Sequence, residues 1–221
     1  MTSVVPHATA PLSGSALQQL RRHIAKQRRQ SSRFAQQRAA QRVLAQFRFF
    51  LDRTRQPIMR AGIYLDAFGE IWTQVLIQEC FKRNIKVFLP KVCAMNQRLV
   101  WVEISKHQYQ NHRFTKHRLG MYEPMATRGQ PISKLDLVIM PLVICDTTGS
   151  RVGMGGGFYD KTLSIAPKRP IRLGLAHEFQ YIAQNIQRAP WDQSLDALVT
   201  PKKCYIFKRP FKKTISLIKK I

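Results

Sequence analysis

Acidic residues are the scarcest feature of this 221-residue chain. It contains 12 Asp and Glu against 37 Lys and Arg, which gives a net charge of +25, and residues 1–50 contain no acid at all. A positive field of this size attracts nucleic acid, anionic membrane or small anionic substrates without selecting among them, and a basic surface also serves solubility. Charge therefore names no function, although it predicts salt-sensitive, non-specific contact of the basic ends with RNA or DNA.

Cysteines and long apolar runs are also scarce. The four cysteines are widely spaced and form no C-x-x-C pair, which argues against a metal finger and favours reduced, buried thiols. No stretch approaches the roughly 18 apolar residues that span a membrane, and the first thirty residues lack the apolar core of a secretory signal. We expect a soluble, cytoplasmic monomer. Import into an organelle is the alternative, because the Arg-rich start also resembles a mitochondrial transit peptide.

The apolar pattern predicts one α/β domain over residues 16–200, between a disordered leader at 1–15 and a basic tail at 201–221. Apolar residues at helical spacing predict two helices after residue 16, with a break near Ser31. Short apolar strands then alternate with helices, which is typical of a mixed or mostly parallel sheet flanked by helices.

Six strands and two further helices are expected in this domain. The strands are predicted at 61–65, 85–89, 99–104, 135–145, 171–176 and 197–200, and the helices at 71–81 and 158–164. Pro90 is expected to cap the second strand, and the basic segment 106–118 to form a surface loop. The run 135–145 is the most apolar of all and predicts a buried central strand.

A glycine-rich segment follows this central strand and reads Arg-Val-Gly-Met-Gly-Gly-Gly-Phe-Tyr-Asp over residues 151–160. In an open α/β sheet, ligands bind at the carboxyl ends of strands, where glycines let backbone N–H groups approach phosphate oxygens. A helix that starts at Phe158 would direct its N-terminal dipole at the same anion. The spacing excludes a Walker loop, and a dinucleotide fingerprint would need glycine at Phe158. A flexible glycine hairpin is the structural alternative.

Residues 135–141, followed by Asp146 and by the segment 149–160, resemble the signature of the 5-formyltetrahydrofolate cyclo-ligase family. Leu20, Arg21 and Arg28 are similar to the basic N-terminal helix of that family. Weaker matches follow in the expected order at 64–70 with Thr73, 86–90, 120–124 and 192–200. The resemblance implies a three-layer α/β domain that uses ATP to convert 5-formyltetrahydrofolate to 5,10-methenyltetrahydrofolate, with release of ADP and phosphate.

The same resemblance implies the roles of individual residues. ATP would be held by Arg21 and by a continuous segment whose members are Arg151, Val152, Gly153, Met154, Gly155, Gly156, Gly157, Phe158 and Tyr159. Arg151 and Tyr159 would also take part in catalysis. The folate would contact Leu65, Glu70 and residues 154–158. Asp160 and Asp196 would hold Mg²⁺, a hard cation that prefers carboxylate, water and phosphate oxygens.

Each role has a structural alternative. Glu70 and Asp160 also fit acids that the helix dipole favours in a first turn, and Asp196 fits a solvated acid. Arg21 equally fits a solvated helix face. The most important departure from the family pattern is Leu17, which stands where the family usually has a lysine that serves the ATP site, although Arg22 or Lys26 could supply charge from an adjacent turn. Cys145 and Lys161, where the family more often has Phe and Arg, are milder departures.

Two other classes of function compete with the cyclo-ligase. One is a nucleic-acid-binding protein that uses the basic ends of the chain, and the other is an ATP-dependent phosphotransferase with a different acceptor.

Overall fold

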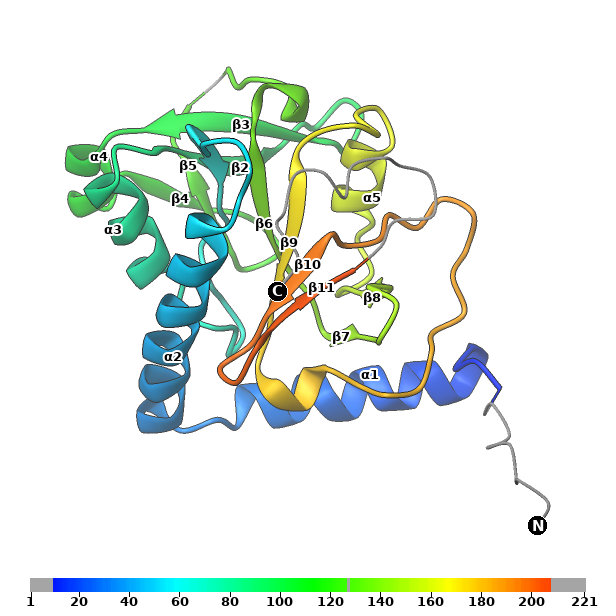
Figure 1. Cartoon of the computed structure of the whole chain (residues 1–221). Helices are drawn as coiled ribbons and strands as arrows, with labels where there is room; N and C mark the ends of the chain where they lie inside the picture. The colour runs from blue at the N-terminus through cyan, green and yellow to red at the C-terminus, as the bar shows by residue number, and fades with distance from the viewer. Residues whose placement is uncertain (1–9, 127, 208–221) are drawn as a thin grey trace, which may run out of the picture.

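A seven-stranded mixed sheet forms the centre of the computed structural model, which describes residues 10–126 and 128–207 (Figure 1). The strand order is β11-β10-β9-β6-β1-β2-β3. The strands are β1 Arg60–Gly62, β2 Lys86–Val92, β3 Leu99–Ile104, β6 Leu137–Pro141, β9 Ile171–Leu175, β10 Ala197–Val199 and β11 Cys204–Ile206. The central pairs are parallel, whereas β3 and β11 pair antiparallel at the two edges. The predicted mostly parallel sheet is confirmed.

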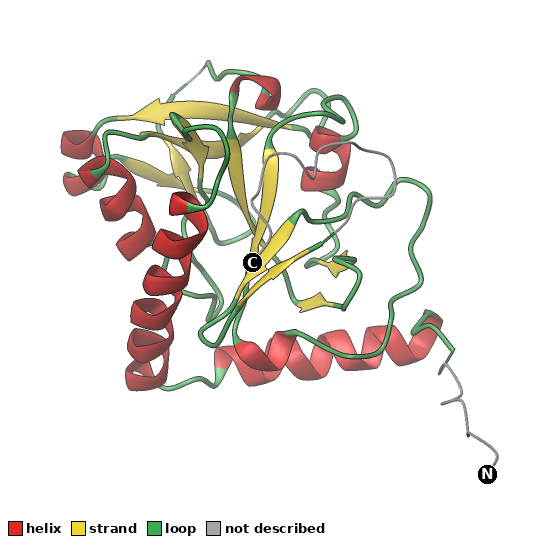
Figure 2. Ribbon diagram, in the orientation of Figure 1, coloured by secondary structure: helices red, strands yellow, loops and turns green. Residues whose placement is uncertain are grey.

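Helices cover both faces of this sheet (Figure 2). They are α1 Gly14–Arg29, α2 Arg33–Asp52, α3 Gln74–Lys82, α4 Lys106–Gln110 and α5 Phe158–Leu163. Successive side chains of a strand point to opposite faces, so Leu137 and Ile139 of β6 pack in the cluster of α2 and α3, and Val138 packs in the cluster of α5. Both faces of β6 are buried, which explains its continuous apolar sequence.

The break between the first two helices is confirmed near Ser31. The side chain of Ser32 accepts the backbone N–H of Ala35 at 3.2 Å and thereby caps α2. A side-chain cap of this kind satisfies one of the free donors at a helix start. The chain turns at this point, so that α2 packs against the seven-stranded sheet, whereas α1 packs with Val143, Ile144 and Ile186 (Figure 1).

The prediction of one strand over 135–145 is wrong in its second half. The strand β6 ends at Pro141, and Ile144–Cys145 forms a separate strand, β7, that pairs antiparallel with β8, Arg151–Val152. Val143 and Ile144 are nevertheless fully buried, because they pack with Ile24 of α1 in an apolar cluster of their own. The apolar sequence of residues 135–145 therefore correctly predicted burial but not a continuous strand.

The basic segment 106–118 is not a plain loop. It contains α4 and the strand β4, Phe114–Lys116, which pairs with β5, Tyr122–Pro124. The side chain of Ser105 accepts the Gln108 N–H at 3.1 Å, and the Gln108 side chain accepts the Ser105 N–H at 2.9 Å. This capping box stabilises a helix that lacks an apolar stripe, which is why periodicity missed it.

Pro90 lies within β2 and does not end it, contrary to the prediction. The neighbouring strand β1 already ends opposite Phe88, and Trp101, the partner of Pro90 in β3, directs both its N–H and its C=O to Gln130. The missing N–H of proline therefore breaks no bond of the ladder.

The ordered structure extends beyond both predicted limits of the domain. Leu12, within the predicted leader, exchanges backbone hydrogen bonds with Asn185 and Gln187, and β11 lies within the predicted tail. Residues 1–9 and 208–221 lie outside the described residues. The four cysteines are free thiols, and Cys80, Cys145 and Cys204 are buried. Over 10–126 and 128–207, no helix is long and apolar enough to cross a membrane.

Candidate active site

The glycine loop joins β8 to α5, and its backbone requires glycine at particular places. Gly155 and Gly157 have φ values of 104° and 64°, a region that other residues rarely adopt. A Cβ atom on Gly156 would lie 2.5 Å from the ring of Phe158. Gly157 is the N-cap of α5, so the loop leads directly into the start of this helix, as the sequence predicts.

Arg151 and Asp160 form an ion pair across this loop. The Arg151 Nη2 lies 2.7 Å from Oδ1 of Asp160, and the two side chains are 5% and 21% exposed. The backbone N–H of Gln193 donates to the same Oδ1 at 3.0 Å. Since both contacts use Oδ1, the second oxygen of Asp160 is the one that could face a cation. Within the described part of the chain, the buried Nε of Arg151 has no hydrogen-bond partner.

Tyr159 lies between this ion pair and the core. Its ring packs edge-on against Trp101 with 6.5 Å between centroids, and the Arg151 guanidinium carbon lies 6.0 Å from the Tyr159 centroid. Burial raises the pKa of the Tyr159 phenol, the charge of Glu70 raises it further, and Arg151 lowers it. Tyr159 therefore stays a neutral hydrogen-bonding group at physiological pH.

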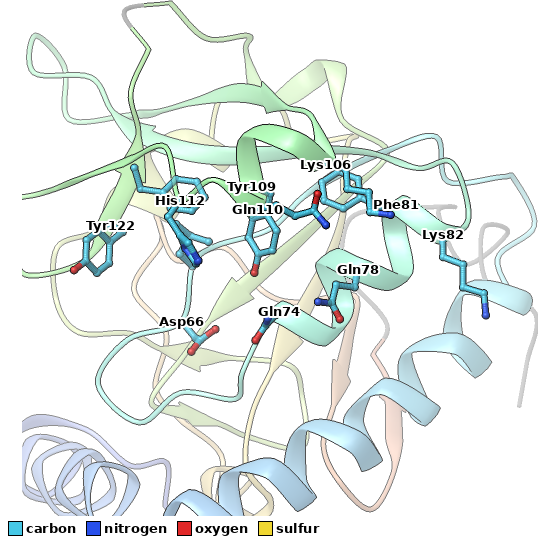
Figure 3. Close-up of a pocket in the computed structure, with 12 residues that line it drawn as sticks. Asp66, Gln74, Gln78, Phe81, Lys82, Lys106, Tyr109, Gln110, His112 and Tyr122 are labelled. Carbon is cyan, nitrogen blue, oxygen red and sulfur yellow. The ribbon is translucent and has the colours of Figure 1, made fainter.

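Leu65 lies just after β1. Together with Asp66 it lines a cavity of about 1060 Å³ (Figure 3). Leu65 packs partly buried against the core cluster of α2 and α3. The predicted substrate residue thus lies at the wall of a large open space.

Helix α1 brings two arginines to the glycine loop. Arg21 and Arg28 are seven residues apart, which is close to two helical turns, so they share one face of α1. The Nη1 of Arg21 lies 3.6 Å from the position that a Cβ of Gly155 would take. The predicted ATP residues Arg21 and Arg151 therefore approach the same loop from separate elements.

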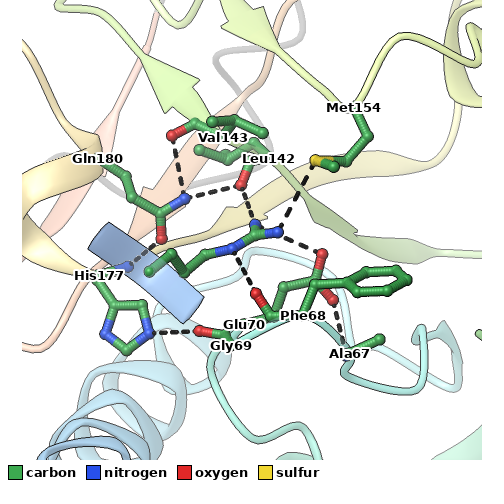
Figure 4. Close-up of polar contacts among 10 residues, drawn as sticks. Ala67, Phe68, Gly69, Glu70, Leu142, Val143, Met154, His177 and Gln180 are labelled. Carbon is green, nitrogen blue, oxygen red and sulfur yellow. Dashed lines mark hydrogen bonds and ion pairs between the residues drawn. The ribbon is translucent and has the colours of Figure 1, made fainter. Parts of the chain in front are cut away.

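Arg28 is the centre of a buried network, and Figure 4 labels its partners Phe68, Glu70, Leu142 and Met154. It is 1% exposed, and its guanidinium donates to the carbonyl oxygens of Phe68 at 3.1 Å and Leu142 at 3.0 Å. It also lies 3.9 Å from the Met154 sulfur and 3.5 Å from a Glu70 oxygen. One cation thus contacts the loop after β1, the end of β6 and the glycine loop.

Glu70 is the buried acid of this network. It is 9% exposed, and its Oε2 accepts the Ala67 N–H at 3.0 Å. Burial raises the pKa of Glu70 to about 7, although the charge of Arg28 acts in the opposite direction. Glu70 precedes the first residue of α3, Gln74, by four positions, so the alternative of a first-turn acid is wrong. Asp160, in contrast, does lie in the first turn of α5.

Two residues of this network were not predicted. His177 is buried, and its Nε2 lies 3.0 Å from the Gly69 carbonyl oxygen. Gln180 donates to the carbonyl oxygens of Leu142 and Val143 at 2.8 and 3.1 Å. Burial lowers the pKa of His177, so its imidazole is neutral at pH 7. Their position just after β9, at the carboxyl end of a parallel strand, was the only available signal.

Asp196 and Leu17 have structural partners. Asp196 accepts the Arg172 backbone N–H at 2.8 Å, which joins the chain ahead of β10 to β9. Its role as a metal ligand remains a prediction. The described residues contain no group of three or more His, Cys, Asp or Glu side chains that could hold a metal. Leu17 packs partly buried against the cluster of Ile24, Val143 and Ile144.

Comparisons with known proteins agree with this arrangement. The profile of the 5-formyltetrahydrofolate cyclo-ligase family matches residues 14–201. The chain is 32% identical to the 5-formyltetrahydrofolate cyclo-ligase of Escherichia coli (strain K12) over 159 residues, which cover 69% of this chain and 85% of that protein. It is 33% identical to the cyclo-ligase of Haemophilus influenzae over 186 residues, which cover 82% of this chain and 96% of that protein.

Solved structures show the same fold. The 5,10-methenyltetrahydrofolate synthetase of Aquifex aeolicus aligns with a TM-score of 0.71 at 23% identity, over 88% of this chain and 94% of that one. The 5,10-methenyltetrahydrofolate synthetase of Mycoplasma pneumoniae aligns with a TM-score of 0.66 at 19% identity, over 83% of this chain and 98% of that one.

Proposed function

Because the chain belongs to the 5-formyltetrahydrofolate cyclo-ligase family, we propose that it uses ATP to close 5-formyltetrahydrofolate to 5,10-methenyltetrahydrofolate, with release of ADP and phosphate. One observation carries this proposal beyond the family match. The buried guanidinium of Arg28 contacts both Glu70, on the loop expected to hold the folate, and Met154, on the loop expected to hold ATP. The two substrates would therefore meet at one site.

The reaction needs positioning more than covalent chemistry from side chains. The γ-phosphoryl group passes to the formyl oxygen, the neighbouring folate nitrogen attacks the formyl carbon, and the carbon–oxygen bond breaks to release phosphate. Phosphoryl transfer of this kind is catalysed by alignment and by neutralising charge. A glycine loop with arginines beside it supplies both.

We assign the nucleotide phosphates to the glycine loop, with Arg21 and Arg151 as the neighbouring cations. The unpartnered Nε of Arg151 supports this assignment, because a buried guanidinium nitrogen without a partner is costly unless a ligand changes its surroundings. Arg151 is then the group that stabilises the transferred charge, and the neutral phenol of Tyr159 positions it through ring contact.

We assign the folate to Glu70, Leu65 and the segment 154–158. The hydroxyl of Tyr64 is buried and, within the described residues, has no partner. Burial raises the pKa of Tyr64, and the charges of Glu70 and Asp66 raise it further, so its hydroxyl lies in the same acidic surroundings. A polar heterocycle bound at Glu70 could form hydrogen bonds with the Glu70 carboxyl group and the Tyr64 hydroxyl.

Magnesium fits this site through Asp160 more clearly than through Asp196. Mg²⁺ is usually held by one or two carboxylates together with phosphate oxygens, so the single partly exposed carboxylate of Asp160 is sufficient on the protein side. When bound there, the ion would neutralise charge on the phosphates. One oxygen of Asp196 accepts a backbone N–H, so we propose Asp196 only as the second carboxylate ligand of Mg²⁺.

The test is the appearance of the methenyl product by absorbance with purified protein, 5-formyltetrahydrofolate, ATP and Mg²⁺. We expect product only when all three are present, and we expect Glu70→Gln to lower kcat/KM for the folate. Lys134→Gln, an exposed change away from the site, is the control and should leave the rate unchanged. ATP consumption without folate would favour the other phosphotransferase. Binding of RNA or DNA with no turnover would favour the nucleic-acid-binding protein.

A cytoplasmic location, a monomeric state and contact of the basic ends with nucleic acid remain predictions from the sequence. The lysine-rich part of the tail lies within residues 208–221, outside the described range. Separate measurements on the full chain, by sedimentation and by binding at low and high salt, would test the last two.

A further inference from the structure

The outer side of α2 carries a row of side chains that the proposed reaction does not use. Phe34, Arg38, Arg42, Phe49 and Arg53 follow one another at helical spacings, so they lie on one side of the helix and its C-cap. The first four are exposed and Arg53 is partly exposed. We call these five residues the α2 stripe. Figure 1 shows α2 at the edge of the molecule, with its full length along the surface.

Two phenylalanine rings of the α2 stripe are exposed, and each has an arginine beside it. Phe34 is 68% exposed and Phe49 is 39% exposed. The guanidinium carbon of Arg38 lies 5.8 Å from the centroid of the Phe34 ring, and that of Arg53 lies 4.2 Å from the Phe49 centroid. An exposed ring next to a guanidinium offers a nucleobase a stacking surface and the adjoining phosphate a cation.

The arginines of the α2 stripe have no acidic partner. Arg38, Arg42 and Arg53 form no ion pair with any described residue. Asp52 is the single acid of α2, and its carboxylate already lies 2.6 Å from the Arg83 guanidinium. Three guanidinium groups of one helix side can therefore bind phosphates without a competing carboxylate.

The length of the α2 stripe suits a short segment of a single strand. Phe34 and Phe49 are fifteen residues apart, which is about 22 Å at 1.5 Å per residue. A stacked strand advances roughly 3.4 Å per nucleotide, so roughly six nucleotides would span the two rings. Gln37 and Gln41 are exposed along one flank of the stripe. Their amides both donate and accept, as does the 2′-hydroxyl that distinguishes RNA from DNA.

A membrane does not suit this surface. A helix that lies in a bilayer interface must insert its apolar side among the lipids. The apolar side of α2 is already buried in the core through Val43, Phe47 and Phe50, which are at most 1% exposed. Only the two separated rings of the α2 stripe would remain for a lipid surface.

We propose that the α2 stripe binds single-stranded RNA, with bases stacked on Phe34 and Phe49 and phosphates held by Arg38, Arg42 and Arg53. This activity goes beyond the proposed reaction and does not depend on it. It also differs from non-specific contact of the basic ends, because it requires the two aromatic rings and lies on a defined side of one helix.

The test measures binding of an unstructured, fluorescently labelled RNA of 12 nucleotides to the full chain by anisotropy. The double variant Phe34→Ala with Phe49→Ala should raise the Kd about tenfold or more and leave its salt dependence unchanged, because stacking is lost and charge is not. The double variant Arg38→Gln with Arg42→Gln should lower the slope of log K against log salt by about 1.4, the value for two lost phosphate contacts.

Matched controls come from elsewhere on the surface. Ile165→Ala and Arg188→Gln remove an exposed apolar side chain and an exposed arginine outside α2, and both should bind the RNA as the wild type does. Urea unfolding should show that both double variants keep the wild-type stability. Formation of the methenyl product should also stay unchanged in them, because the four substituted residues lie outside the candidate active site.

Four outcomes would overturn the proposal. The phenylalanine double variant could bind the RNA as tightly as the wild type. It could lose the same affinity for heparin, which has charge but no bases, as it loses for RNA. The wild type could bind the corresponding DNA strand as tightly as the RNA, where we expect about a threefold preference for RNA. The phenylalanine variant could lose binding to phosphatidylserine vesicles and keep its RNA binding, which would assign the stripe to a membrane.

Discussion

The guanidinium of Arg28 lies 3.5 Å from the carboxylate of Glu70, in a place where both are almost fully shielded from water. The pair is not a simple salt bridge, because Arg28 also donates to the Phe68 and Leu142 carbonyl oxygens, and Glu70 accepts the Ala67 N–H. These extra hydrogen bonds offset the cost of burying two charges. Burial still dominates at Glu70, whose pKa rises to about 7.

Arg28→Gln should shift the pH dependence of the reaction. If the ionised form of Glu70 binds the folate, kcat/KM for the folate rises with pH through about 7 in the wild type. The charge of Arg28 lowers the pKa of Glu70, so its removal raises this pKa and moves the rise to higher pH. Arg28→Lys keeps the charge and should move it less.

Arg22→Gln, an exposed change on the same helix, is the control for this experiment. Glu70→Gln should abolish the rise altogether, because the titrating group is gone. A profile for Arg28→Gln that coincides with that of the wild type would show that Arg28 does not act on Glu70.

Asp160→Asn should raise the concentration of Mg²⁺ needed for half-maximal activity by about tenfold or more, which corresponds to about 1.4 kcal/mol of lost binding. The reason is that an amide is a weaker ligand for a hard cation than a carboxylate. The measurement is a Mg²⁺ titration of the initial rate at saturating ATP. Asp52→Asn, in a surface pair with Arg83, should not change the titration. If Asp160 only holds Arg151, activity falls with no change in the Mg²⁺ requirement.

Leu17→Lys tests the most important departure from the family pattern. The new ammonium group should lower KM for ATP about threefold, because it restores a cation on the helix that carries Arg21. It should also cost about 1 kcal/mol in the free energy of unfolding, since Leu17 packs partly buried against Ile24 and Val143. Steady-state kinetics and chemical denaturation measure the two effects. Gln18→Lys, on an exposed neighbour, should leave KM for ATP unchanged.

Gly69→Ala and Gly14→Ala form a matched pair. Both glycines have positive φ values, 77° and 54°, so alanine is strained at either place. A Cβ on Gly69 would collide with the Arg28 carbonyl oxygen, whereas a Cβ on Gly14 meets nothing within 4 Å. We expect Gly14→Ala to lower the free energy of unfolding by about 1 kcal/mol and Gly69→Ala by about 3 kcal/mol. Equal losses in thermal or urea unfolding would contradict this packing.

Glu79→Gln should destabilise the fold in a pH-dependent way. The hydrogen bond from Arg48 lowers the pKa of Glu79 to about 2, with Arg83 contributing and burial opposing. A carboxylate with a lowered pKa stabilises the folded chain above its ordinary pKa near 4.5, and this stabilisation is lost as the pH falls towards 2. The difference in free energy of unfolding between wild type and variant should therefore be largest at neutral pH. A difference that grows in acid would contradict the assignment.

Much of the sheet could be predicted, because a strand that is buried on both faces has a continuous apolar sequence. β3, Leu99–Ile104, was predicted to the residue, and the glycine loop was found because left-handed backbone needs glycine. The division between β6 and β7 could not be found in the same way. The carbonyl oxygen of Leu142 accepts hydrogen bonds from Arg28 and Gln180 and not from a neighbouring strand. The pattern of apolar side chains does not show which donor a backbone carbonyl accepts from.

The residues of the candidate site that belong to a recognisable motif could be predicted. Those that are brought to the site only by tertiary contacts could not. Arg151, Asp160 and Glu70 belong to segments that resemble the family. His177 and Gln180 act on backbone oxygens of distant segments, and no local pattern distinguishes them from other polar side chains. Arg28 was matched to the basic helix of the family, but its place at the centre of a buried network follows only from the structure.

The position of Arg28 also bears on the order in which the chain folds. Its side chain reaches partners 40, 114 and 126 residues further along the sequence. Contacts of such long range require most of the intervening chain to be in place before they form, because closing each loop costs conformational entropy. The sheet can collapse around its own strands first, whereas the docking of α1 must wait for β6 and the glycine loop. We therefore expect a newly made chain to acquire its core before its binding site.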